Sequence, residues 1–280
     1  MIQDTVVYQP DNCLKHGYAG LAREIFSEIF ANRWLTTQLL KRDLVAMYKQ
    51  SIAGFLWLLI NPLVSVATFV ILSRSGVFSI GDVKIPYAIY AVLGMSFWQL
   101  FAAGLVTSAS SLVNAGSMIS KINFSKKSLV FASVGASLLS FIIQFILVLV
   151  LFVVYRTAPS PMIFLTPLLA LPMIALSLGL GFIVSLLNAV LRDVGAAIPV
   201  LMNFLLFLTP VLYARKLGIA GTLASYNPLY YLVSVPRDII INGKTDHLAG
   251  YLIAAAISFF VFVICLSIFH LTESRVAERI

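Results

Sequence analysis

Long uncharged apolar stretches recur along the chain and dominate its pattern. Four of them contain no Asp, Glu, Lys or Arg and are each long enough for one transmembrane helix, which needs about 20 residues. Two longer uncharged runs each supply one further helix from their most apolar part. The pattern therefore predicts an all-α membrane protein with six transmembrane helices, over residues 53–73, 87–107, 129–154, 164–188, 194–213 and 249–270.

The segment before the first span, residues 1–52, shows a helical period. From Leu21 onward apolar side chains that include Ile25 and Phe26 share one face, and a second stretch repeats the pattern around Leu40 and Leu44. We expect a cytoplasmic N-terminal segment with an amphipathic interface helix. The helix either lies in the membrane interface or packs, solvated, on the base of the bundle, and the pattern leaves both interpretations open.

The connection between the fifth and sixth spans, residues 214–248, is unusual. Its middle part, 217–236, is uncharged and about as long as a span. Glycines together with Asn227 and Pro228 interrupt it, so re-entrant helices at the outer face are predicted rather than a seventh crossing. The serine-rich residues 108–120 are expected to form a loop or a short helix, and residues 271–280 a cytoplasmic tail.

Charge and composition agree with a membrane location. Of the 280 residues, 60% are hydrophobic and 11% charged, whereas soluble domains have roughly 25% charged residues. The net charge of +8 comes from basic residues that flank the apolar runs, which indicates membrane orientation rather than nucleic-acid binding. More Lys and Arg fall in the predicted inner segments than in the outer ones, so both termini of this multi-pass protein are expected in the cytoplasm.

The chain lacks the residue patterns of catalysis and nucleotide binding. No G-x-x-x-x-G-K-[ST] phosphate loop is present, and His16, His247 and His270 look isolated, without neighbours at metal-ligand spacing. No charged residue falls near the middle of a predicted span, although intramembrane enzymes and ion-coupled transporters usually carry one. We therefore predict no catalytic, cofactor or metal site, and an energy source on another chain.

Polar and aromatic residues within the spans allow two interpretations each. Amides such as Gln99, Asn188 and Asn203 can bond neighbouring helices or line a hydrophilic pathway. Aromatic rings can form interface belts, or present faces along which sugar rings slide. The candidates for a glycan pathway are Trp57, Phe69, Phe97, Trp98, Phe101, Phe204 and Phe207.

An ordered set of short motifs resembles one family over residues 40 to 245. The motifs are Lys41-Arg42-Asp43-Leu44 with Tyr48-Lys49-Gln50-Ser51, Trp98-Gln99-Leu100-Phe101, Ser111-Leu112-Val113-Asn114, Arg192-Asp193-Val194, Leu208-Thr209-Pro210-Val211 with Tyr213, and Asn227-Pro228. In this order and spacing they resemble the ABC-2 type permeases that export polysaccharides. Ser125 departs from the family, because many relatives have proline there.

The resemblance implies a homodimeric permease of the bacterial inner membrane, paired with two separate ATP-binding subunits that carry the Mg-ATP. It implies lipid-linked polysaccharide as cargo, with O-antigen first and capsule or teichoic acid as alternatives. ATPase coupling is implied for Lys41, Arg42, Asp43, Tyr48, Lys49, Asn114, Lys121, Arg192 and Asp193. An outer gate is implied at Pro210, Tyr213, Asn227, Pro228 and Arg237.

Two other functions stay open on the sequence. An ABC-2 exporter of drugs or small lipids has the same architecture, although the first-span motif and the aromatic residues disfavour it. A membrane-embedded glycosyl- or acyltransferase needs a carboxylate or histidine at membrane depth, and only Asp43 and Asp193, at the cytoplasmic edge, approach that position.

Overall fold

The computed structural model describes residues 17–49, 85–119, 121–122, 124–212 and 226–277, with single positions or pairs between 56 and 71. Every regular element within these residues is a helix, which confirms the predicted all-α class. The first predicted span, 53–73, lies mostly outside the described residues, as do Phe69 and Tyr213.

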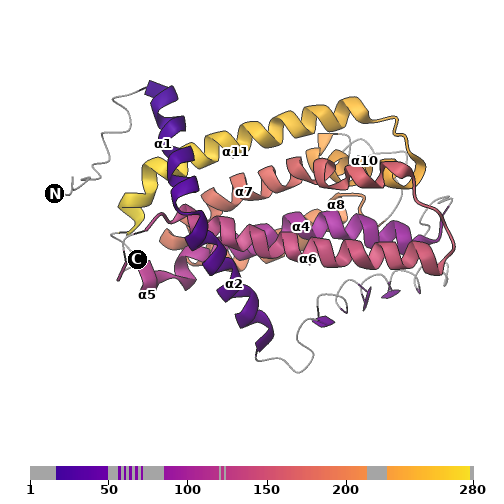
Figure 1. Cartoon of the computed structure of the whole chain (residues 1–280), viewed down its shortest axis with the longest axis horizontal. Helices are drawn as coiled ribbons and strands as arrows, with labels where there is room; N and C mark the ends of the chain where they lie inside the picture. Colours follow the sequence, from indigo (N-terminus) through magenta and orange to yellow (C-terminus); the bar gives the residue numbers. More distant parts are fainter. Residues whose placement is uncertain are drawn as a thin grey trace.

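Four long helices run side by side along the longest axis of the molecule (Figure 1). They are α4 (Tyr87–Asn114), α6 (Lys127–Val154), α7 (Thr166–Val190), which follows the short 3-10 helix η3 (Pro161–Leu165), and α11 (Leu248–Ala277). All four are long and apolar enough to cross a membrane. Helix α4 packs against α6 and α7, and α7 packs against α11, so α4 and α7 form the centre of the bundle.

Helix α8 (Asp193–Leu208) is shorter than the other bundle helices. Its 16 residues span about 24 Å, against about 30 Å for the hydrocarbon core of a bilayer. The helix ends five residues before the predicted end of the fifth span at 213. Thr209, which precedes Pro210, adopts an extended backbone with φ −98° and ψ 126°. The cause is local, because a proline disfavours helical geometry in the residue before it.

The serine-rich segment after residue 107, predicted as a loop or a short helix, is helical. Helix α4 continues through it to Asn114, and the short helix α5 (Gly116–Ile119) follows. The hydroxyl of Ser111 donates to the carbonyl of Ser108 at 2.8 Å, so the serine side chain is satisfied by its own helix. Burial of this stretch against neighbouring helices outweighs the modest helix propensity of serine.

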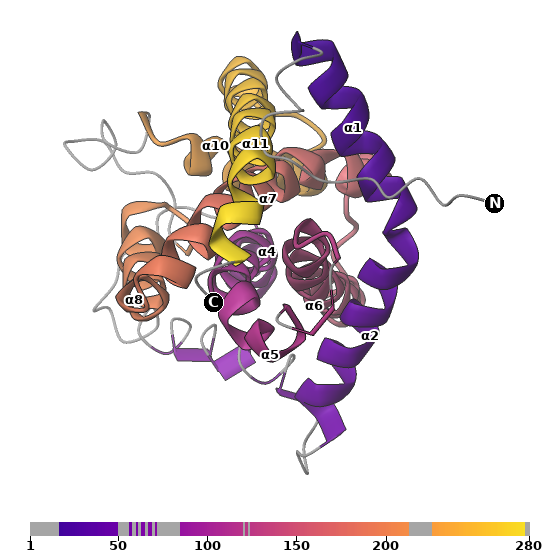
Figure 2. The same ribbon diagram turned by 90° about the vertical axis from the view of Figure 1, so that its left-hand side faces the viewer.

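Helices α1 (Gly17–Ala31) and α2 (Arg33–Lys49) run across the bundle near one end (Figures 1 and 2). We call this end, where α5 and the last turns of α11 also lie, the base of the bundle. Ile25 and Leu39 are buried there, and α2 packs against α6. The single apolar face predicted for α1 is only partly buried, because the neighbouring Phe26 and Phe30 are more than 60% exposed.

Helix α10 (Pro228–Asn242) lies at the opposite end, which we call the far end (Figure 1). It packs against α4, α7, α11 and η3. The Asn227 side chain accepts a hydrogen bond from the Leu229 amide, and Pro228 occupies the first turn, so the residues predicted as a break are the start of this helix. Gly243, with φ 73°, ends it in the left-handed conformation that glycine adopts most readily.

Candidate functional site

A buried group of charged side chains joins three helices at the base. The Lys127 ammonium, 1% exposed, donates to Glu28 Oε2 of α1 at 2.8 Å and to Glu273 Oε1 of α11. His270 Nδ1 lies 3.5 Å from Glu28 Oε2 and 3.7 Å from Glu273 Oε1. We call these four residues the base ion cluster. They tie α1, α6 and α11 together at one point.

The position of Lys127 makes its carboxylate partners necessary. It is the first residue of α6, where the positive end of the helix dipole disfavours a cation. A buried ammonium also needs paired charges and hydrogen bonds to offset its lost hydration. In the sequence, Lys127 is one of the basic residues that flank the apolar runs. A signal for acidic partners is its place directly before a long apolar run, where a helix N-terminus is expected and carboxylates are favoured over cations.

His270 is not isolated from other residues that could bind a metal, so the prediction made from its neighbours in the sequence was wrong. Ligand atoms of Glu28, His270 and Glu273 lie within 4.8 Å of one another, an arrangement of the kind that can hold a metal ion. Lys127 already bonds to both carboxylates and places a positive charge between them. The cluster thus contains its own cation.

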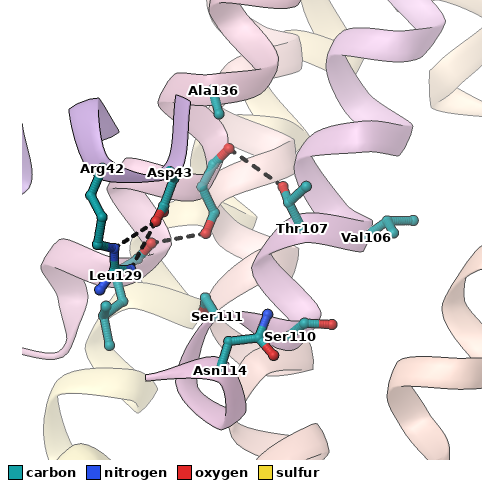
Figure 3. Close-up of a pocket in the computed structure, with 10 residues that line it drawn as sticks. Arg42, Asp43, Val106, Thr107, Ser110, Ser111, Asn114, Leu129 and Ala136 are labelled. Carbon is teal, nitrogen blue, oxygen red and sulfur yellow. Dashed lines mark hydrogen bonds and ion pairs between the residues drawn. The ribbon is translucent and has the colours of Figure 1, made fainter. Parts of the chain in front are cut away.

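A pocket of about 320 Å³, which we call the base pocket, opens at the base between α2, α4 and α6 (Figure 3). Arg42 and Asp43 of α2 form one wall. A stripe of α4 at helical spacing forms the second wall, and a stripe of α6 forms the third. The pocket is lined by Arg42, Asp43, Val106, Thr107, Ser110, Ser111, Asn114, Leu129, Ser133 and Ala136.

Arg42 links α2 to the segment after α4. Its Nε and Nη2 donate to Asp43 Oδ1 at 2.9 and 2.8 Å, and its Nη1 lies 3.7 Å from Met118 Sδ on α5. Of the predicted coupling residues, the structure thus brings Arg42, Asp43 and Asn114 to one pocket. Lys41 and Lys121 are exposed at the base, and the side chains of Tyr48 and Lys49 lie outside the described residues.

The turn between α7 and α8 carries the other predicted coupling pair. Arg192 and Asp193 are both exposed, and the ion pairs of the described residues do not include one between them. Asp193 lies in the first turn of α8, where a carboxylate is favoured by the helix dipole. The pair therefore presents free charge at the surface of this turn.

Asn188 fixes the same turn from inside the bundle. Its Nδ2 donates to the Ala109 carbonyl of α4 at 2.8 Å, and its Oδ1 accepts from the Gly195 amide of α8 at 2.7 Å. The side chain is 4% exposed. Asn188 thus bonds neighbouring helices, one of the two uses that the sequence allowed.

Arg237 organises the far end of the bundle. It is 3% exposed, its Nη1 donates to the Val211 carbonyl at 2.7 Å, and its guanidinium lies 3.8 Å above the centre of the Tyr90 ring. The Tyr87 hydroxyl donates to the Leu212 carbonyl at 2.7 Å. The non-helical segment after α8 is therefore held by side chains that satisfy its carbonyl groups.

The predicted gate residues meet at this segment. Asn227 Nδ2 donates to Thr209 Oγ1 at 3.0 Å, which connects the start of α10 to the end of α8, and Pro210 is buried beside it. Burial raises the pKa of the neighbouring Asp238 carboxyl above 3.8, against the opposing charge of Arg237. The far end thus combines one buried cation with a carboxyl group that is costly to ionise.

The predicted pathway aromatics fall into two groups. Phe97, Trp98 and Phe101 are at most 3% exposed and pack in the core, with the Phe97 ring 5.2 Å from that of Phe141. Trp57, Phe204 and Phe207 are at least half exposed. The second group thus lies at the surface of the described residues, and the first is buried.

Comparison with known families settles the class of the protein. The profile of the ABC-2 type transporter family matches residues 35–241, most of the chain. The chain belongs to the ABC-2 type transporter family. Membership confirms the resemblance drawn from the motifs and identifies the chain as a transport permease.

Curated relatives of this ABC-2 chain include permeases named for one cargo. The O-antigen export system permease protein RfbA of Klebsiella pneumoniae is 27% identical over 242 residues, which cover 85% of this chain and 91% of that protein. The protein of the same name from Myxococcus xanthus is 27% identical over 267 residues, which cover 90% of this chain and 98% of that protein.

The matched stretch contains the pocket and the far-end residues but only part of the base ion cluster. Lys127 lies within 35–241, whereas Glu28, His270 and Glu273 lie outside it. The family profile alone therefore does not identify the partners of Lys127.

Proposed function

We propose that this chain is the membrane-spanning permease subunit of an ATP-driven exporter. Its cargo in this proposal is a lipid-linked polysaccharide, most specifically O-antigen, and its location is the bacterial inner membrane. Two copies of the chain work with two ATP-binding subunits. The observation that carries the proposal is the family match over residues 35–241, together with relatives named as O-antigen export permeases over most of their length.

The base is the proposed site of force transfer from the ATP-binding subunits. Helices α1 and α2 lie across the bundle there, and Arg42 contacts α5 through Met118. A push on α2 would pass to α6 through their packing, and from α6 to α11 through the base ion cluster, whereas a push on α5 would pass to α4. The exposed charges of Lys41, Lys121 and Asp193 are available for contacts with another subunit.

Six crossings remain our proposal for the topology. They would be the four long helices, α8 and residues 53–73, with both termini and the base in the cytoplasm. The short length of α8 is compatible with a crossing because the segment after it is non-helical and has its carbonyls bonded by Arg237 and Tyr87. Irregular backbone at membrane depth is tolerated where protein satisfies it. On this view α10 belongs to the outer gate.

The burial of some aromatic side chains narrows the set of residues that can line the proposed glycan pathway. Trp57, Phe204 and Phe207 are exposed on one protomer and can form the wall of a passage between two copies. Phe97, Trp98 and Phe101 would reach such a passage only after a rearrangement of the core around α4. We therefore assign the wall to the exposed group and a supporting role to the buried group.

Reconstitution tests the proposal directly. The chain and its co-purified ATP-binding subunit are placed in liposomes that contain lipid-linked glycan, and ATP-dependent appearance of glycan on the opposite leaflet is measured. Transport should require both chains and ATP. Movement of glycan by this chain alone would overturn the proposal. Stimulation of ATP hydrolysis by drugs or small lipids, but not by lipid-linked glycan, would reassign the cargo.

A pair of charge reversals tests the coupling surface. Lys121→Glu reverses an exposed charge at the base, and Lys244→Glu reverses an exposed charge at the far end. We expect Lys121→Glu to weaken co-purification with the ATP-binding subunit several-fold and Lys244→Glu to leave it unchanged. Equal effects of the two variants would count against a coupling surface at the base.

A further inference from the structure

The charges and hydrogen-bonding groups that line the base pocket indicate which class of ligand it can bind. Of the pocket-lining residues, which all lie in the described part of the chain, only Arg42 and Asp43 are charged. Two nitrogens of Arg42 are already bonded to Asp43 Oδ1. The positive charge of Arg42 is therefore largely offset by Asp43 within the wall of the pocket. An anion such as free phosphate would meet the Asp43 carboxylate together with the arginine, so the pocket favours a neutral ligand.

The hydroxyl groups of the pocket are arranged mainly as acceptors. Thr107 Oγ1 donates to the Ala103 carbonyl at 2.8 Å, Ser111 Oγ to the Ser108 carbonyl at 2.8 Å, and Ser133 Oγ to the Leu129 carbonyl at 3.0 Å. A hydroxyl has one donor and two acceptor positions, so each of these oxygens keeps accepting capacity. A ligand that matches this wall must bring several donors of its own.

Ser110 and Asn114 complete the polar stripe of α4. They lie one helical turn apart and are drawn beside each other in Figure 3. Ser110 can both donate and accept, and the Asn114 amide offers two donors and an acceptor. Val106, Leu129 and Ala136 add apolar surface to the same pocket. Neutral donors and acceptors over an apolar floor suit a hydroxylated ring with C–H faces.

We propose that the base pocket binds one sugar residue of the transported glycolipid, through hydroxyl groups that donate to Asp43, Thr107, Ser111 and Ser133. The volume of about 320 Å³ lies at the lower end of the range of ligand pockets, so one ring or slightly more is the expected occupant. This assignment rests on the proposed function. It gives Arg42, Asp43 and Asn114 a role in cargo binding in addition to their predicted place in coupling.

A labelling experiment tests the pocket without requiring transport. The full chain carrying Ser110→Cys, with Cys13 replaced by serine, is assembled with its ATP-binding subunit in phosphatidylcholine nanodiscs. The native Cys265 is buried and is expected to react slowly. The rate of reaction with a small maleimide is measured with increasing N-acetylglucosamine, galactose or inorganic phosphate. Ser27→Cys, on the exposed face of α1, is the matched control.

We expect either sugar at millimolar concentration to slow labelling of Ser110→Cys several-fold and to leave Ser27→Cys unchanged. Phosphate should not protect either position. Asn114→Cys, on the same stripe, is the second reporter if Ser110→Cys does not fold. A glycerol headgroup offers similar hydroxyl donors, so the experiment is repeated without sugar in phosphatidylglycerol nanodiscs. Protection by phosphatidylglycerol alone would assign the pocket to a phospholipid and overturn the proposal.

The sugar-binding proposal would also be overturned if sugar protected neither reporter position, or if phosphate protected either of them. Failure of this pocket assignment can be distinguished from failure of the proposed function. A wild-type complex that exports lipid-linked glycan while its pocket shows no protection refutes only the pocket assignment. A complex that exports no glycan refutes the proposed function whatever the labelling result.

Discussion

Removal of the buried lysine charge at the base should destabilise the protein strongly. In the variant Lys127→Met the side chain keeps a similar length but loses its bonds to Glu28 and Glu273. Both carboxylates are only 14% and 13% exposed, so they would remain buried without their cation. Loss of one partner of a buried ion pair costs about 3–5 kcal/mol. We expect a decrease of that size in the free energy of unfolding.

The assay is reversible unfolding in mixed detergent micelles, followed by tryptophan fluorescence. Because Glu28 belongs to α1, part of the loss should appear as local release of this helix, measured as faster amide hydrogen exchange over residues 17–31. Lys126→Met is the matched control, since the neighbouring Lys126 takes part in none of the ion pairs of the described residues. It should change stability by no more than about 0.5 kcal/mol.

A triple variant distinguishes the loss of the ion-pair attraction from the cost of leaving two carboxylates buried without a cation. Lys127→Met combined with Glu28→Gln and Glu273→Gln removes all three charges and should recover a large part of the loss, since a neutral replacement of a buried ionic group is often tolerated. If Lys127→Met cost no more than Lys126→Met, the cluster would not hold α1 on the bundle. The reasoning from burial and partner distances would then be refuted.

Three further predictions concern the far end and the turn after α7. Arg237→Met should lower stability by about 2–4 kcal/mol, measured by unfolding, because the Val211 carbonyl loses its charged donor and Tyr90 its cation; an unchanged midpoint would contradict the assigned role. Asn188→Ala should cost about 2–4 kcal/mol, because it leaves a buried donor and a buried acceptor unpaired, and a cost below 1 kcal/mol would contradict this. The pKa of Asp238 is raised in the folded protein, so ionisation of this carboxyl lowers the stability of the fold as the pH rises through and beyond 3.8. Asp238→Asn should therefore be more stable than wild type near neutral pH. Unfolding experiments over a pH series should show that this advantage vanishes below pH 3.8.

Several features follow from local sequence and were predicted on that basis. The uncharged runs locate the four long helices because a helix of about 20 apolar residues is the simplest way to satisfy the backbone in lipid. Asn227 and Pro228 mark a boundary, since one caps a helix and the other fits its first turn. Family membership also followed from the sequence, through ordered motifs over most of its length.

The ends of elements were predicted less well, for identifiable reasons. The serines after residue 107 suggested a loop or a short helix, whereas neighbouring helices bury part of this stretch and the long helix α4 continues as far as Asn114. The fifth span was drawn through Pro210, although the residue before a proline tends to leave the helix. In both places a local preference competed with packing, and the balance between them was not visible in composition alone.

The tertiary structure alone decided which faces meet. In lipid, the face of a helix that points outward is as apolar as the face that points inward, so α11 and α6 carry little amphipathic signal. The partners of Lys127 lie 99 and 146 residues away, and the sugar-sized pocket takes its walls from three separate helices. The same ambiguity hid the burial of Phe97, Trp98 and Phe101, which pack in the core. The sequence by itself determined a helical membrane permease; the packing of its helices decided where its charges pair, where its pocket opens and which aromatic rings are exposed.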